Sequence, residues 1–356
     1  MEIVRQWYRR YFTDPQVVIL ALLLVAGFAV VLTFGEMLAP VLASVVIAYL
    51  LDGIVEKMQH WGAHRLAAVL FVIVCLLAFL LFATLGLLPL LARQITQLFH
   101  QLPAMISKGQ ELLLALPGRY QNFISEQQVS NLTSAIGTEL AGQGQNILTL
   151  FLPSLFGLVT IVIYVVLMPV LVFFFLKDKD KIVDWISSYL PTERGLSTEV
   201  WRDVNSQIAN YVRGKVWEIF VVGAVSYATF TIMGLQYSVL LATLVGLSVI
   251  IPYIGAAVVT LPIAVIAFFQ LGWSAEFGYI LLAYGVIQAL DGNVLVPLLF
   301  SEVVNLHPVT IIVAVLVFGG IWGFWGVFFA IPLATLVQAV LKAWPAKHEQ
   351  EEEDEV

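Results

Sequence analysis

The chain has 356 residues, of which 60% are hydrophobic and 12% are charged, and its mean hydropathy is +0.94. Soluble domains carry about 25% charged residues, and several apolar runs here exceed the ~18 residues that span a bilayer. The composition excludes a soluble protein and predicts an all-α, polytopic integral membrane protein with about eight transmembrane helices. The net charge of −7 reflects a local acidic tail, so it does not indicate nucleic-acid binding.

Apolar runs divide the chain into membrane and polar parts. Residues 1–16, with three arginines, are a predicted cytoplasmic N-terminus, and residues 342–356 are a predicted acidic cytoplasmic tail. Three transmembrane helices are expected within 17–92 and a fourth at 147–176. The predicted helices are 17–34, 37–51, 66–92, 147–176 and 216–234, followed by long interrupted stretches at 237–271 and 308–341 with 276–300 between them.

Basic residues predict the orientation. Of 17 Lys and Arg residues, fourteen fall in segments predicted on one side and three in the loop between the third and fourth spans. The positive-inside rule places the richer side in the cytoplasm. The sequence therefore predicts a multi-pass membrane protein with both termini cytoplasmic.

Two polar segments show helical spacing of apolar residues: 93–146, expected outside, and 177–215, expected in the cytoplasm. One interpretation is a surface for a partner protein. The other is amphipathic helices that lie on the lipid bilayer or on neighbouring subunits, and this one is favoured because neither segment holds a ligand motif.

The region 216–341 is the predicted transport core, and it contains two similar segments. "LQYSVLLATLVGLSVIIPYIGAAVVTLPIAV" and "LHPVTIIVAVLVFGGIWGFWGVFFAIPLATL" each have an apolar half, a break rich in Gly, Pro and aromatic residues, and a second apolar half. Paired breaks of this kind point to the binding site of a secondary transporter. Pro252 has no N–H for the carbonyl of Ser248, and Pro332 has none for that of Phe328.

The geometry of these two segments stays open at this point. Residues 237–271 as one straight helix would extend about 50 Å, well beyond a hydrocarbon core of about 30 Å. Each segment is therefore either a tilted, kinked span or a re-entrant hairpin that turns at "IPYIGA" or "GGIWGFWG". In the second case the crossing helix 276–300 makes the hairpins enter from opposite faces.

The crossing helix carries an acid. Asp291 lies one helical turn from Gln288, Gly292 permits local unwinding next to Asn293, and Pro297 frees a backbone carbonyl. No Lys or Arg lies between residues 215 and 342, so no basic partner is expected nearby. Asp291 is then neutral, solvated, matched by a cation or a solute donor, or a structural residue at a helix end.

The sequence contains no Walker-type GxxxxGK[ST], HExxH or Gly-x-Ser-x-Gly motif. It predicts no enzyme, no cofactor and no metal site. Glu218, Glu276 and Glu302 fall at predicted span ends, where a charge can reach water.

Four stretches carry a family resemblance: "YVRGKVWEIFVVG", "GLQYSVLLATLVGLSVIIPYIGA", "LDGNVLVPLLFSEVVNLHP" and "FGGIWGFWGVFFAIPLATL". They resemble the autoinducer-2 exporter family of bacterial membrane transporters, and most of all its PerM-type permeases. The resemblance implies a homo-oligomer such as a pentamer, elevator-like movement, and export of a small polar solute without an ATPase. It also implies a polar site role for Asp291, where many members have Glu.

The leading hypothesis is a permease that exports a small polar solute, an autoinducer-2-like signal or a metabolite. One alternative is an antiporter in which Asp291 binds Na⁺ or H⁺, and another is a membrane scaffold that acts through 177–215. The candidate binding residues are Ser248, Pro252, Tyr253, Gly255, Gln288, Asp291, Gly292, Asn293, Pro297, Gly320, Gly323, Gly326 and Pro332.

Overall fold

The computed structural model describes residues 15–114, 163–189, 195–252, 254–300 and 306–343. Within these ranges all regular structure is helical, and five stretches are long and apolar enough to cross a membrane, as expected of a polytopic all-α protein. Predictions for 115–146 and for the acidic tail beyond residue 343 lie outside the described residues. The helices before the transport core are α2 (Pro15–His60), α3 (Arg65–Phe82), α4 (Leu88–Leu114), α8 (Met168–Lys177), α9 (Lys179–Ser188) and α10 (Gly195–Ile232).

The break predicted between residues 34 and 37 is wrong, because α2 is one helix of 46 residues. Gly35 and Glu36 are compatible with helical backbone and lie inside it. At 1.5 Å per residue α2 extends about 69 Å, roughly twice the thickness of a bilayer core. Pro40 lies within this helix, where it removes one backbone N–H, and the Ser44 hydroxyl donates to the Pro40 carbonyl at 2.6 Å.

Because α2 is one helix where two were predicted, the side of the membrane on which the later segments lie needs a direct test. We expect cysteines introduced at Gln128 and at Ser188, with Cys75 replaced, to react with an impermeant maleimide from outside and from inside the cell, respectively. Protein in which Cys75 is replaced and no other cysteine is introduced gives the background labelling. Labelling of both positions from the same side would contradict the predicted topology.

The amphipathic stretch "QITQLFHQL" forms a helix, as predicted, but it is part of a longer helical segment. A π-helical turn (Ala83–Leu87) joins α3 to α4, so the chain is helical from residue 65 to residue 114. Ile95 and Leu98 of α4 pack against the core of the transport region, and the Gln94 side-chain oxygen accepts a hydrogen bond from the Leu240 N–H at 2.8 Å. This part of the segment is therefore a docking arm for the chain's own α11.

The first interrupted segment is a hairpin, which excludes a single tilted, kinked span for this part of the chain. Its arms are α11 (Ser238–Ser248) and α12 (Ile254–Leu271). A Cβ built on Gly255 would lie 1.8 Å from the Ser248 carbonyl oxygen, a contact impossible for residues seven apart on one helix. With 11 residues, α11 covers about 17 Å, only about half of a bilayer core.

The second interrupted segment reverses in the same way. Its arms lie in α15 (Pro308–Phe328) and α16 (Ala330–Ala343), and the turn occurs inside α15, where Gly323 has φ 57° and ψ −132°. A Cβ on Gly326 would lie 1.8 Å from the Phe318 carbonyl oxygen. We refer to residues 238–271 as hairpin 1 and to residues 308–343 as hairpin 2.

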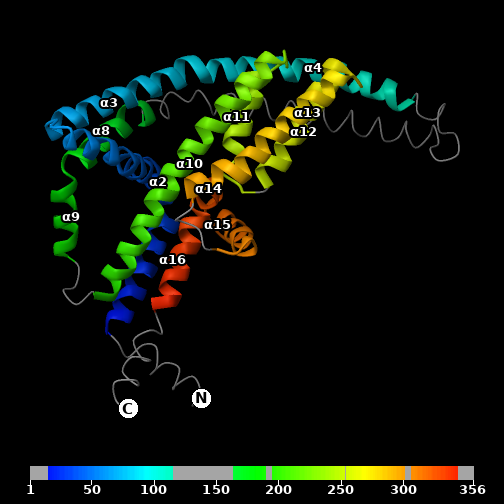
Figure 1. Cartoon of the computed structure of the whole chain (residues 1–356). Helices are drawn as coiled ribbons and strands as arrows, with labels where there is room; N and C mark the ends of the chain where they lie inside the picture. Colours follow the sequence, from blue (N-terminus) through cyan, green and yellow to red (C-terminus); the bar gives the residue numbers. More distant parts are fainter. Residues whose placement is uncertain (1–14, 115–162, 190–194, 253, 301–305, 344–356) are drawn as a thin grey trace, which may run out of the picture.

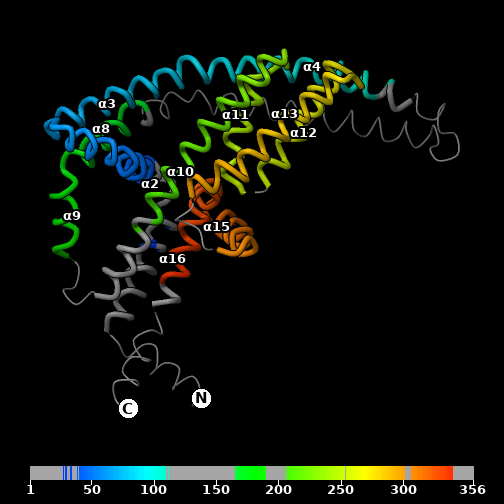
Figure 2. The backbone as a smooth tube through the Cα atoms, in the orientation of Figure 1, coloured from blue at the N-terminus to red at the C-terminus, as the bar shows by residue number. Residues whose placement is uncertain are grey.

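One continuous stretch connects the hairpins: α13 (Ala275–Leu290), a π-helical turn (Asp291–Leu295) and α14 (Val296–Phe300). Hairpin 1 joins its N-terminal end and hairpin 2 follows its C-terminal end, so the hairpins approach from opposite ends of this stretch (Figures 1 and 2). α10 packs against α11, α13, α14 and α16. α10 therefore contacts both hairpins and acts as their common support.

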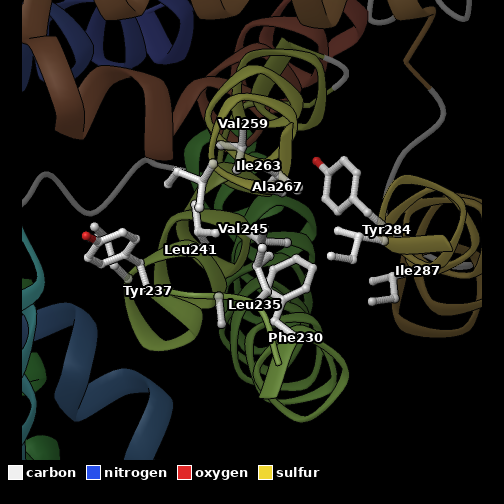
Figure 3. Close-up of a cluster of buried hydrophobic side chains, with 14 of the residues drawn as sticks. Phe230, Leu235, Tyr237, Leu241, Val245, Val259, Ile263, Ala267, Tyr284 and Ile287 are labelled. Atoms are coloured by element: carbon white, nitrogen blue, oxygen red, sulfur yellow. The ribbon is translucent and has the colours of Figure 1, made fainter. Parts of the chain in front are cut away.

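The core of the transport region lies between α10, hairpin 1 and α13 (Figure 3). Phe230 of α10, Leu241 and Val245 of α11 and Ile263 of α12 are almost completely buried there. The Tyr284 hydroxyl of α13 donates to the Ala256 carbonyl of α12 at 2.8 Å. Apolar packing and this partly buried hydrogen bond thus hold hairpin 1 on α10 and α13.

Candidate functional site

A cavity of about 560 Å³ lies where α10, the turn of hairpin 1, the α13–α14 stretch and hairpin 2 meet. Its polar lining comes from Lys215, Glu218, Ser248, Gln288 and Asp291. Its apolar lining includes Tyr211, Phe300, Leu306, Ile311 and Ile331. Small-molecule sites combine a mostly apolar wall with a few convergent polar groups in this way.

α10 contributes a buried ion pair to this cavity. Lys215 Nζ lies 2.6 Å from Glu218 Oε2, and the two side chains are only 5% and 3% exposed. Two predictions are therefore wrong. Glu218 does not reach water at a span end, and Asp291 does not lack a basic residue in its surroundings, since Lys215 lines the same cavity.

The local sequence explains why these groups share one face. Tyr211, Lys215 and Glu218 are spaced by four and three residues, which places them together on a helix. α10 runs without interruption across residues 215 and 216, where the predicted cytoplasmic segment ended. An acid three residues after a lysine inside an apolar helix is the signal that could have identified the pair.

The α13–α14 stretch brings the predicted acid into the cavity. Gln288 and Asp291 are three residues apart and both line it, as their spacing predicted. A π-helical turn begins at Asp291, in which the Val296 N–H reaches the Asp291 carbonyl, one residue before Pro297. Such turns are frequent at functional sites, and the local unwinding expected at Gly292 takes this form.

Two polar atoms on this stretch are buried without a hydrogen-bond partner: the side-chain nitrogen of Gln288 and Oδ1 of Asp291. A buried polar atom without a partner costs free energy comparable to a lost hydrogen bond. Two residues of the cavity wall therefore each carry an unpartnered polar atom, a donor on Gln288 and an acceptor on Asp291. A bound solute or ion would satisfy them.

The structure brings some of the candidate residues together and not others. Ser248, Pro252, Gln288, Asp291, Gly292 and Pro297 line the cavity. The Asn293 side chain is exposed and donates to the Ala289 carbonyl at 2.8 Å. Gly255 and Gly326 form the close crossings of the hairpins instead of cavity wall. Gly320, Gly323 and Pro332 are outside the lining, and Tyr253 lies outside the described residues.

The two hairpins touch through one tip and one pair of arms. Ile251, in the turn of hairpin 1, packs against a buried cluster formed by Ala314, Val315, Ala330 and Ala334 of hairpin 2. The turn "GGIWGFWG" of hairpin 2 is not part of the cavity lining. The first turn therefore lies at the cavity and the second does not, so the structure does not bring the two turns together there.

The carbonyl expected to be free at the first break, that of Ser248, is not the one that takes a side-chain partner. The Ile251 N–H reaches the Ser248 carbonyl at 3.0 Å, so the tight turn compensates for Pro252. The Val249 carbonyl is the one that takes a side-chain partner, the ammonium of Lys215 at 3.0 Å. In the part of the chain that the structure describes, no group of three or more His, Cys, Asp or Glu residues could hold a metal ion.

Membrane-length helices with two opposed hairpins around a cavity that several polar residues line define a multi-pass membrane protein of the transporter type. The model of the family described as "AI-2E family transporter" matches residues 18–346, and the chain belongs to this family.

Relatives extend over most of the chain. It is 46% identical over 345 residues to the "Putative permease PerM" of Escherichia coli strain K12. These aligned residues make up 97% of this chain and 98% of that protein. It is 26% identical over 309 residues to the "Putative transport protein YueF" of Bacillus subtilis, with 84% and 82% covered. The likeness to the first of these includes the segments that build the cavity.

Proposed function

We propose that this protein is a secondary transporter of the bacterial inner membrane that exports a small polar solute, an autoinducer-2-like signal or a metabolite, through the cavity between its hairpins. The observation that carries the proposal is the pair of unpartnered polar atoms on Gln288 and Asp291, two residues that line a cavity of about 560 Å³. A donor and an acceptor one helical turn apart suit a solute group that both accepts and donates hydrogen bonds.

The arrangement of the hairpins supports a transport cycle without ATP. The sequence has no nucleotide-binding loop, so in this proposal the gradient of the solute itself supplies the driving force. Ile251 joins hairpin 1 to hairpin 2 beside the cavity. Movement of one hairpin against the other would open the cavity to one side of the membrane at a time, in an elevator-like step within a homo-oligomer such as a pentamer.

One observation favours a second candidate, a cation-coupled antiporter. Asp291 carries a carboxylate oxygen without a partner, and the positive charge in the cavity is already paired with Glu218. A Na⁺ or H⁺ at Asp291 would neutralise the remaining charge. In this case the solute and the cation would use the same face of the α13–α14 stretch.

The test is flux in proteoliposomes. We expect purified protein to move at least one solute from a panel of small hydroxylated metabolites at a rate well above that of protein-free vesicles. Imposed Na⁺ and H⁺ gradients separate the two candidates, since only the antiporter responds to them. Correctly assembled protein that moves neither solute nor ion would overturn the proposal.

A further inference from the structure

The C-terminal end of α11 points into the cavity and presents a negative pole. The last carbonyls of a helix have no partner within it, and the helix dipole adds partial negative charge at this end. At α11 the turn satisfies two of them, because the Ile250 and Ile251 N–H groups bond the carbonyls of Leu247 and Ser248. The carbonyl of Val249 is bonded instead by Lys215.

Four groups surround the Lys215 ammonium. The Val249 carbonyl oxygen lies 3.0 Å away and the Glu218 carboxylate 2.6 Å away. The rings of Phe300 and Tyr211 have their centroids 5.1 and 5.9 Å from Nζ, within range of cation–π attraction. A helix C-terminus, a carboxylate and two aromatic faces together form a cation site.

Secondary transporters with broken helices bind coupling cations at this kind of place, where the C-terminal end of a half-helix meets acidic and carbonyl oxygens. We infer that in this protein the ammonium of Lys215 is a tethered cation that permanently occupies such a site at the end of α11. A free cation is then not needed there, and Asp291 is left as the cavity acid open to solute or ion. Lys215 acts as a positioning residue, since it fixes the tip of hairpin 1 on α10.

The inference predicts that shortening the side chain creates a vacant cation site. Lys215→Ala removes three methylene groups together with the ammonium group, a volume that n-propylammonium matches. We expect n-propylammonium chloride to raise the thermal unfolding temperature of purified Lys215→Ala protein by several degrees, because a ligand that binds only the folded state stabilises it. Sodium chloride at equal ionic strength and n-propanol separate a specific cation effect from salt and solvent effects.

The matched controls are the wild type and the double variant Lys215→Ala/Glu218→Gln. The wild type has its site filled and the double variant lacks the carboxylate, so neither should respond to n-propylammonium. Equal responses in all three proteins, or none in Lys215→Ala, would overturn the inference. Lys215→Ala protein that assembles only when purified with n-propylammonium would support it, and failure to assemble even then would count against it.

Solute flux is a second measurement. It would stay unchanged on substitution if the Lys215–Glu218 ion pair only filled space. We expect Lys215→Ala to lose at least tenfold in solute flux and to regain part of it with n-propylammonium. Lys215→Met/Glu218→Leu replaces the buried pair by apolar groups, a change that is often neutral for stability, and we expect it to assemble without transporting. Wild-type flux in this variant would overturn the inference. Failure of the wild type to transport would instead contradict the proposed function and leave the unfolding test decisive here.

Discussion

Replacement of Asp291 by Asn is expected to lower transport by at least tenfold, while the protein still assembles, if Asp291 binds a cation or a proton during transport. The change keeps the size of the side chain and removes its charge. Oδ1 of Asp291, a residue of the cavity wall, has no hydrogen-bond partner, so the change breaks no hydrogen bond of this oxygen. Solute flux in proteoliposomes, measured across a range of pH, checks the result.

The pH profile of this variant separates the roles that an acid can have here. If Asp291 binds a cation or a proton, Asp291→Asn should lose flux and pH dependence together. If it only accepts a hydrogen bond from a neutral solute, the amide should keep substantial flux and lose the pH dependence alone. An unchanged flux with an unchanged pH profile would show that Asp291 is structural.

Glu276→Gln is the matched control, because it makes the same chemical change on the same helix. Glu276 lies in the first turn of α13, is exposed, and is far along the chain from the cavity lining. We expect its flux to stay within about twofold of the wild type, since exposed charges contribute little. A loss equal to that of Asp291→Asn would assign the effect to net charge and not to the cavity.

Local pattern made much of the transport core predictable. Pro252 removes a backbone N–H and Gly323 permits a positive φ, which weakens a helix at these places, and the structure reverses direction at both. The spacing of Gln288 and Asp291 was enough to place both on one face, because helical geometry acts over three residues. What local pattern left open was whether a break kinks the helix or folds it back, since that depends on contacts with other helices.

The residues that the prediction missed are those that come from a distant part of the chain. In the sequence, Lys215 lies at the end of a predicted cytoplasmic segment and contributes only to the predicted orientation. It is far from Asp291 along the chain, so the sequence does not indicate that both line one cavity. The continuity of α10 brings it there. The continuity of α2 was missed for a related reason, because a short polar interruption was taken for a loop when helical backbone accommodates it.

Gly255→Ala and Gly326→Ala are expected to destabilise the protein strongly, each by more than about 2 kcal/mol, the range of severe substitutions. The added Cβ would lie 1.8 Å from a backbone carbonyl oxygen of the opposite arm, Ser248 or Phe318. Backbone at a close crossing cannot yield as a flexible side chain can, so the arms would have to separate. Leucine at Gly255 would therefore disturb folding as well as transport.

Gly285 and Gly323 provide the comparison. A Cβ at Gly285, in α13, meets nothing within 4 Å, and Gly285→Ala should be neutral or slightly stabilising because alanine favours helices. Gly323→Ala also meets no atom, but its φ of 57° is unfavourable for other residues, so we expect an intermediate loss of about 1–3 kcal/mol. Thermal unfolding and size-exclusion profiles of the four variants in detergent measure this order. If Gly255→Ala and Gly326→Ala unfold at the same temperature as Gly285→Ala, the hairpin arms do not cross at backbone contact, and a re-entrant path loses its main support.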